Sequence, residues 1–262
     1  MKRFLLLLIG ATAMLLAGCG HEEEPEPING LTITYETTDG NPIVLADESA
    51  FNVAIVSHTY GVINFEDNLT EVGDWAFGEC VNLLSIKIPN SVTRIGDGAF
   101  SNCEALEEVQ LSTRLTSLGE SPFFGCFKLK SFSGKYATAD GRGLVVNGEL
   151  RHIAPNGLTE YTIPSEASVI GYDVFYSCVK LKSVTIHSKV TKIKDNAFYY
   201  CEGLKSVYCY ATTPPALGSA VFDNNDGGDV PIGCKIYVPA ESVNQYKTAT
   251  NWKRYAKYIT AM

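Results

Sequence analysis

Five cysteines recur at a fixed interval and are the side chains best placed for metal or redox chemistry. Cys80, Cys103 and Cys126 are 23 residues apart, and after a step of 52 residues Cys178 and Cys201 are again 23 apart. Zinc needs four ligands around one point, whereas one thiol per repeat forms a line. A buried thiol packs as a small hydrophobe. We therefore predict that this column is core packing and that the chain binds no metal.

Other chemical signatures are missing from the sequence. It contains no G-x-S-x-G elbow, no H-E-x-x-H pair and no P-loop. His58, His152 and His187 lie in the folded body, and we expect them to be exposed β-surface residues rather than general bases. The prediction is a protein without enzymatic activity and without a cofactor. The enzymatic alternative would require a deep pocket with converging carboxylates.

The elements that position the cysteines form a 23-residue repeat. Apolar residues surround each cysteine at constant offsets, with a Phe three before it, a Leu three after it, and β-branched or aromatic residues six after it. The apolar residues Leu83, Ile86 and Ile88 predict a strand, in which Ile86 and Ile88 point the same way at period two. The segment from Ala76 to Cys80 predicts one helical turn. One such unit buries too little apolar surface to fold alone, so the repeats must stack.

The repeated unit resembles a known family. Residues 92–109 (Val92 to Val109) resemble the BspA-type leucine-rich repeat, which is common in surface proteins of Bacteroidetes and some protists. The resemblance covers roughly Ile63 to Tyr210 and implies a curved, right-handed, mainly β solenoid with short helical turns. It also implies adhesion, because family members have been linked to host matrix and plasma proteins such as fibronectin and fibrinogen.

An insertion near residues 134–167 interrupts the repeats. Two apolar runs, Gly143–Val146 and Glu149–Ile153, flank Asn147-Gly148. Asn-Gly between apolar runs is a strong hairpin signal, so we predict a variant repeat enlarged by a hairpin. The hairpin is either a binding device or a tolerated insertion, and the residues do not decide between the two.

Each open end of a solenoid needs a cap. We predict a β-rich N-terminal cap over residues 31–66, a solenoid over 67–210 and a C-terminal cap over 211–262. Ile63–Phe65 aligns with Ile86–Ile88, which places the first rung there. The C-terminal cap should hold a strand over Lys235–Pro239 and then a helical segment with Trp252, Tyr255 and Ile259 on one face.

Two charged clusters lie in this C-terminal region. Lys247, Lys253, Arg254 and Lys257 form the only basic cluster apparent along the chain, and we interpret it as the solvated face of the cap. Residues 223–229 are rich in Asp and Asn but lack the ordered spacing and distal Glu of a calcium loop. We predict a plain acidic loop there.

The N-terminus has the layout of a secretory signal. Lys2 and Arg3 precede an apolar run that is too short to span a bilayer. The run ends in Leu16-Ala17-Gly18-Cys19, which resembles a bacterial lipobox, so residues 1–18 are predicted as a signal peptide with lipidation at Cys19. The alternative is an ordinary signal peptide followed by a chance cysteine.

Residues 19–30 form an acidic tether. His21 to Pro27 combines like charges with proline, which prevents collapse. This run resembles the export signal that sends Bacteroidetes lipoproteins to the outer face of the outer membrane, and a plain solvated spacer is the alternative. Cleavage removes two of the 21 basic residues and leaves all 29 acidic ones, so the net charge changes from −8 to −10. That balance excludes nucleic acid as a main partner.

The remaining candidate for function is the outer side of the main strands. Residues five and seven after each cysteine point away from the core at period two. The second column is the candidate binding face, and a residue of the C-terminal strand extends it: Lys87, Gln110, Ser133, Thr185, Tyr208 and Tyr237. A merely solvated sheet is the alternative.

The combined prediction is an outer-membrane lipoprotein exposed on the cell surface. It binds protein ligands through its repeat face and reaches the membrane through the lipid on Cys19. The resemblance points to host extracellular proteins as the ligands. The alternative is a structural or accessory outer-membrane lipoprotein in a glycan- or nutrient-handling complex.

Overall fold

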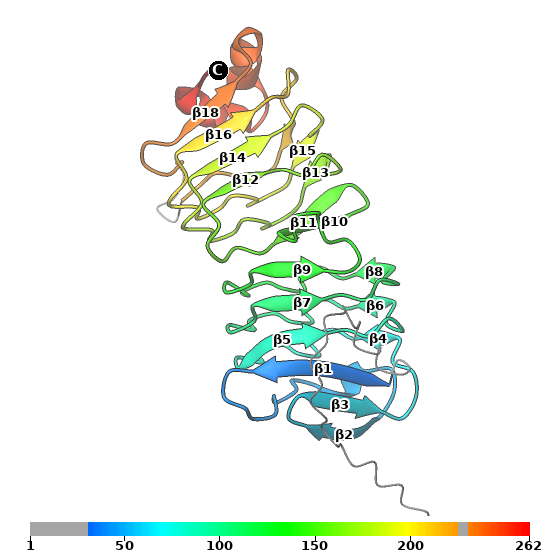
Figure 1. Cartoon of the computed structure of the whole chain (residues 1–262). Helices are drawn as coiled ribbons and strands as arrows, with labels where there is room; N and C mark the ends of the chain where they lie inside the picture. The colour runs from blue at the N-terminus through cyan, green and yellow to red at the C-terminus, as the bar shows by residue number, and fades with distance from the viewer. Residues whose placement is uncertain (1–30, 225–229) are drawn as a thin grey trace, which may run out of the picture.

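The structure is a computed structural model that describes residues 31–224 and 230–262. These residues form an elongated stack, with antiparallel strands at one end and short helices at the other (Figure 1). The stack is a β-solenoid of about 8 turns, which confirms the predicted fold class. The predicted signal peptide, Cys19 and the tether lie outside the described residues, and so does the acidic loop from 225 to 229.

The first half of the solenoid is built on a six-stranded sheet with the order β2-β3-β1-β5-β7-β9. The strands β5, β7 and β9 pair in parallel and align Ile86, Val109 and Phe132, which face the core. The bounds of the six strands are β1 (Thr32–Thr37), β2 (Ile55–Thr59), β3 (Val62–Phe65), β5 (Leu83–Lys87), β7 (Glu108–Gln110) and β9 (Ser131–Ser133).

The N-terminal strands close this end by antiparallel pairing. β1 lies between β3 and β5 and runs antiparallel to both, with Tyr35 opposite Ile86. The expectation that Ile63–Phe65 forms a rung directly beside Ile86–Ile88 is therefore wrong, because β1 separates the two segments. A single 3-10 turn, η1 (Glu48–Ala50), connects β1 to β2.

A second row of short strands carries the apolar residue that lies eight before each cysteine. β4 (Glu71–Val72), β6 (Arg94–Ile95) and β8 (Ser117–Leu118) form a three-stranded parallel sheet. The glycine after each strand makes the corner. A Cβ on Gly119 would lie 2.4 Å from the carbonyl carbon of Gly96, so no larger residue fits without moving the backbone.

The second half repeats this arrangement in two further sheets. Its main sheet has the order β12-β14-β16-β18-β19, and all of its pairs are parallel. The ladder continues past Tyr210 into the C-terminal segment without a break. The strands are β12 (Glu160–Thr162), β14 (Ser183–Ile186), β16 (Ser206–Cys209), β18 (Lys235–Val238) and β19 (Ile259–Ala261).

The predicted hairpin is confirmed and lies between the two halves. β10 (Gly143–Val146) and β11 (Glu149–Ile153) pair antiparallel. Asn147 and Gly148 have φ values of 52° and 77°, as a two-residue type I′ turn requires. β11 then pairs in parallel with β13 (Val169–Ile170), which is followed by β15 (Lys192–Ile193) and β17 (Ala216–Leu217).

The segment before each cysteine is a series of turns, so the predicted helical turn is wrong. The Gly78 N–H donates to the Trp75 carbonyl at 2.8 Å, but the Phe77 N–H donates to Ala99 in the next rung, also at 2.8 Å. A helix needs its N–H groups for bonds within the segment, whereas alternate groups here bond to the neighbouring rung. The positive φ of Trp75, 58°, is also incompatible with a helix.

The core consists of two apolar clusters that meet at the hairpin. Leu144 and Val146 of β10 belong to the first cluster, and Leu150 and Ile153 of β11 belong to the second. Phenylalanine ladders run through both clusters. The ring centroids are 5.0 Å and 5.2 Å apart between residues 77, 100 and 123, and 4.7 Å and 5.4 Å apart between residues 175, 198 and 222.

The C-terminal helices cover the last rung. They are η2 (Ala240–Ser242), α1 (Val243–Thr248) and η3 (Trp252–Tyr258). Trp252, Tyr255 and Ile259 are all buried, as their expected common face requires, and the Trp252 indole donates to the Pro215 carbonyl at 2.7 Å. Asp223, at the start of the predicted acidic loop, is buried and accepts a hydrogen bond from Tyr255 at 2.8 Å, so this carboxylate has a structural partner.

Candidate binding surfaces

The residues predicted to form one binding face lie in two groups, one on each half of the solenoid. Lys87, Gln110 and Ser133 lie side by side, because the parallel register of β5, β7 and β9 aligns them. Gln110 and Ser133 are exposed, and Lys87 is half-buried. Neighbouring strands are about 4.8 Å apart, so these three polar side chains are close enough to contact one ligand.

The second group follows the same rule on β14, β16 and β18. Thr185, Tyr208 and Tyr237 are in register, and the rings of the two tyrosines stack with their centroids 4.9 Å apart. β9 and β12 belong to different sheets, however, so the column is interrupted between Ser133 and Thr185. The hairpin therefore divides the predicted face into two surfaces.

A shallow groove of about 370 Å³ lies over the first group. β1 supplies Thr34 and Glu36 to its wall, because it pairs directly with β5. The Ser85 hydroxyl donates to the Glu36 carboxylate at 3.3 Å, and Glu108 lies on the neighbouring strand. The groove thus combines carboxylates with the Lys87 ammonium, which suits hydrogen bonding to a protein surface of mixed charge.

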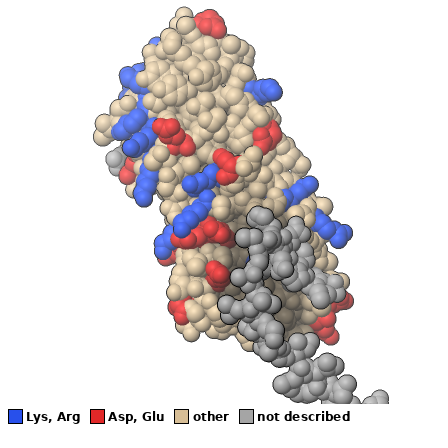
Figure 2. Space-filling model, viewed as in Figure 1, with Lys and Arg blue, Asp and Glu red and all other residues tan. Residues whose placement is uncertain are grey.

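A lysine-rich margin, here called the basic edge, lies where the main strands begin. It consists of Lys128, Lys130, Lys180, Lys182, Lys205 and Lys235. Figure 2 shows basic side chains gathered along the margin of the second half on which β12, β14, β16 and β18 begin in Figure 1. The interpretation of the C-terminal cluster as the only basic one is therefore wrong, since folding aligns lysines that lie far apart in the sequence.

The cysteine column is core packing, as predicted. All seven cysteines within residues 31–224 and 230–262 are buried free thiols. Some of these thiols also have a polar role that their hydrophobic pattern did not predict. Cys103 donates to the carbonyl of Phe77 at 3.0 Å, and Cys201 donates to that of Phe175, also at 3.0 Å. Burial raises the pKa of the Cys178 thiol to about 12, which makes it unreactive at neutral pH.

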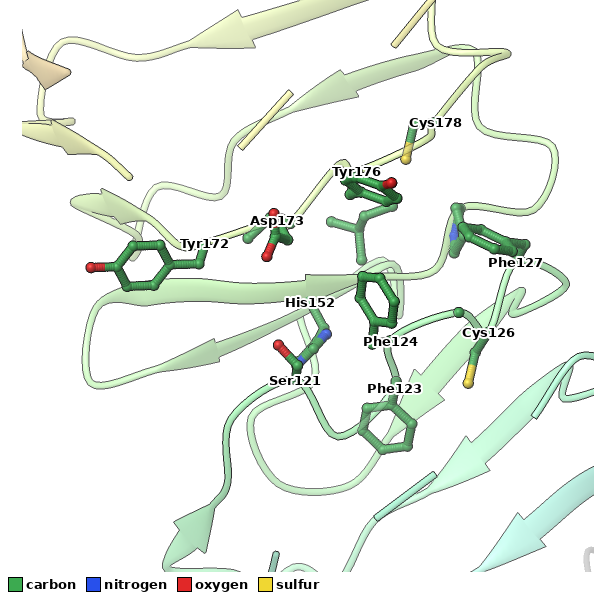
Figure 3. A pocket seen from close by; sticks show the side chains of 14 residues that line it. Ser121, Phe123, Phe124, Cys126, Phe127, His152, Tyr172, Asp173, Tyr176 and Cys178 are labelled. Carbon is green, nitrogen blue, oxygen red and sulfur yellow. The ribbon is translucent and has the colours of Figure 1, made fainter. Parts of the chain in front are cut away.

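A small pocket lies where the third repeat, the hairpin and the fourth repeat meet (Figure 3). Its volume of about 40 Å³ holds about one water molecule. Phe124 and Tyr176 face each other at its mouth, with ring centroids 5.6 Å apart. This volume is too small for an organic substrate.

His152 contradicts the expectation that the three histidines are exposed. Its ring packs edge-on against Phe123, with centroids 5.7 Å apart. Burial, together with the neighbouring Arg151 cation, lowers the pKa of His152 to about 3. A residue that is so weakly basic is poorly matched to proton transfer at neutral pH, so His152 acts here as a packing residue.

His58 and His187 are half-buried, as His152 is, so the expectation of exposed histidines is wrong for all three. Both are also hydrogen-bonded. The His58 ring contacts the Tyr35 hydroxyl at 3.0 Å, and burial lowers the pKa of His58. The His187 ring lies 3.0 Å from the Pro164 carbonyl. Within the described ranges, no group of three or more His, Cys, Asp or Glu side chains is arranged to hold a metal ion.

Comparison with known protein families identifies the repeat. The family model described as BspA type leucine rich repeat region matches residues 49–138 and 154–237 in 6 copies. This chain belongs to the BspA-type leucine-rich repeat family. The matched residues include the rungs on both sides of the hairpin, and the gap between the two ranges contains the hairpin itself. The predicted resemblance is thereby confirmed.

Solved structures with this fold come from several bacteria. A leucine rich cell surface protein from Faecalibacterium prausnitzii is 21% identical, with a TM-score of 0.50; the match covers 66% of this chain and 52% of that one. The pneumococcal vaccine antigen PcpA is 16% identical, with a TM-score of 0.47, over 74% of this chain and 64% of that one. This chain thus matches about half of the first protein and under two thirds of the second. No curated protein matches in sequence.

BspA-type leucine-rich repeat proteins are typically cell-surface proteins, and leucine-rich repeats are generally binding modules. In the part of the chain that the structure describes, no helix is both long and apolar enough to cross a membrane. Family membership therefore places this chain among the leucine-rich repeat surface proteins.

Proposed function

We propose that this BspA-type protein is a cell-surface lipoprotein that binds a protein ligand through its strand face and has no enzymatic activity. The observation that supports this proposal is the groove over Lys87, Gln110 and Ser133. Its side chains project from hydrogen-bonded strands, so little conformational freedom is lost when a ligand binds. Carboxylate, ammonium, amide and hydroxyl groups in one groove match the polar composition of a protein partner.

The proposed anchor is a lipid on Cys19, at the start of the tether formed by residues 19–30. Several acyl chains are needed for stable attachment, because one chain of myristoyl size binds only marginally. The acidic tether separates the solenoid from the membrane and leaves its strand face accessible. In intact cells, external protease should remove the solenoid, and Cys19→Ser should move the protein out of the membrane fraction. Full protection from protease would instead place the solenoid in the periplasm.

The proposed ligands are host extracellular proteins, and a binding screen tests this. The chain from residue 19 to 262, carrying Cys19→Ser, is passed over immobilised fibronectin and fibrinogen. A double variant, Lys87→Ala with Gln110→Ala, should weaken any captured interaction by roughly tenfold, because truncating central contacts typically costs over 1 kcal/mol. The control, Arg114→Ala with Ser117→Ala, likewise removes one cationic and one neutral polar side chain, here from exposed positions outside the groove, and should leave binding unchanged.

The competing proposal is an accessory lipoprotein of a glycan- or nutrient-handling complex. It predicts that outer-membrane partners co-purify with the protein and that fibronectin and fibrinogen do not bind. Equal binding by the groove variant and its control would reject the groove as the binding site, whichever ligand is captured.

A further inference from the structure

The basic edge has a second feature besides its charge, which is its regular register. Position four after each cysteine is occupied by Leu84, Glu107, Lys130, Lys182 and Lys205 in successive repeats. The column thus changes from apolar to acidic to basic along the solenoid. The Lys205 N–H donates to the Lys182 carbonyl at 2.8 Å, and the Lys235 N–H donates to the Lys205 carbonyl at 2.9 Å. Three lysines therefore start three consecutive rungs.

Few of these ammonium groups have an anionic partner. Lys130 pairs with Glu107 at 2.5 Å, and the Lys205 ammonium donates to the Ile232 carbonyl at 2.7 Å. None of the ion pairs found among residues 31–224 and 230–262 includes Lys182 or Lys235. Like charges on neighbouring strands destabilise each other. A ligand that carries several negative charges would relieve this repulsion. The basic edge is thus a local positive surface on a protein whose net charge is −8.

Apolar surface lies directly beside these charges. One hollow is lined by Val179, Gly203 and the side chains of Lys180, Lys182 and Lys205. A second hollow shares Val179 and Lys180 with the first and adds Phe127 and Pro155. The exposed fractions of Phe127 and Val179 are 51% and 44%, which is large for apolar residues. Lysine stems add further apolar area below the ammonium groups.

We propose that the basic edge binds an extended acidic segment of a partner protein, with a bulky apolar side chain of that segment seated between Phe127 and Val179. The acidic groups lie against Lys182, Lys205 and Lys235. The combination of cations with exposed apolar residues favours a peptide over a sulfated or phosphorylated polymer, which has charge but no apolar side chain. This surface is separate from the strand face, so the proposal stands independently of the function proposed above.

The test measures binding of labelled peptides to the chain from residue 19 to 262 carrying Cys19→Ser. The probe is a fluorescein-labelled peptide in which glutamates flank two leucines, and binding is followed by fluorescence anisotropy. Lys182→Gln, Lys205→Gln and Lys235→Gln together should weaken binding by roughly tenfold, because exposed ion pairs are individually weak and three are removed. Raising the salt concentration from about 50 to about 300 mM should weaken the wild-type complex and affect the triple variant far less.

A matched triple variant controls for net charge. Lys189→Gln, Lys247→Gln and Lys253→Gln remove the same charge from outside the basic edge and should leave binding intact. Val179→Thr keeps the shape of the side chain but not its apolar character, and it should weaken the leucine peptide without affecting a peptide that has serines in place of the leucines. Circular dichroism checks that each variant is folded.

Three outcomes would overturn the proposal. The first is equal loss of affinity in the two triple variants, which would show that only the net charge matters. The second is equal binding of the leucine and serine peptides. The third is stronger binding of dextran sulfate than of the leucine peptide at the same salt concentration, since this would identify a polyanionic glycan as the better ligand.

Discussion

Replacing one phenylalanine of the core ladder should unfold one half of the solenoid before the other. Phe100 is fully buried and stacks between two rings, with centroids 5.0 Å and 5.2 Å away. Phe100→Ala should lower the free energy of unfolding by about 3–5 kcal/mol, because it removes a buried ring and leaves a cavity. That is a large share of a typical domain stability of about 5–15 kcal/mol.

The loss should be confined to the first half, because the hairpin separates the two core clusters. A stability change of this size corresponds to a shift of the urea midpoint by roughly 1–5 M. The circular dichroism transition in urea should therefore split in two. The two tryptophans provide the assignment: Trp75 lies in the first repeat and is 52% exposed, and Trp252 is buried in the C-terminal cap. In a Trp75→Phe background, fluorescence reports only the second half and should keep its wild-type midpoint.

Two matched variants decide whether this reasoning holds. Phe124→Ala removes the same side chain from an exposed position in the next repeat and should cost little. Phe198→Ala removes the equivalent ring of the second ladder and should shift the Trp252 signal instead. If Phe100→Ala and Phe124→Ala cost the same, the ladder does not carry the stability. If Phe100→Ala shifts the Trp252 midpoint as much as the circular dichroism midpoint, the two halves unfold as one unit.

Further expectations follow from the pKa values and the hairpin turn. Burial raises the folded-state pKa of the Cys80, Cys178 and Cys234 thiols to about 12, so they should not react with Ellman's reagent until the protein unfolds. Thiols of the unfolded chain ionise at lower pH, so the free energy of unfolding should fall between about pH 9 and 12. The folded-state pKa of His152 is lowered from 6.5 to about 3, so its neutral ring stabilises the fold above pH 6.5 and loses this contribution as the pH falls towards 3. His152→Gln should therefore make the melting temperature depend less on pH between 3 and 6.5. Asn147→Ala should lower the free energy of unfolding, measured in urea, by roughly 1 kcal/mol, because alanine is unfavourable at the φ of 52° that Asn147 adopts. Asn147→Gly should leave it unchanged, because glycine adopts positive φ readily.

The repeat interior could be predicted from the sequence because its constraints are local and periodic. A fixed spacing of 23 residues aligns each Phe, Leu and Cys with its equivalent in the next rung, so one correct alignment places the whole core. Asn147-Gly148 identified its hairpin for a similar reason, since both residues must adopt positive φ.

The errors lie where the fold depends on contacts between distant segments. Nothing in Thr32–Thr37 indicates that it inserts antiparallel between β3 and β5, because its alternating pattern fits any sheet edge. The packing of His152 depends on Phe123, which lies 29 residues earlier in the chain. The basic edge was missed because its lysines are scattered along the chain, although comparing position four after each cysteine would have found three of them.

The hairpin divides the surface of the molecule into two proposed binding surfaces of different character instead of one long face. It ends the sheet that carries Lys87 and Gln110, and it divides the apolar core. Before the hairpin, the column four residues after each cysteine has an apolar residue and an ion pair between Glu107 and Lys130, and after the hairpin it is basic. A continuous solenoid would present one graded surface to one large ligand. A solenoid with this break can hold a polar protein surface on its first half while an acidic segment binds the edge of its second half, so variants on one surface should leave binding at the other unchanged.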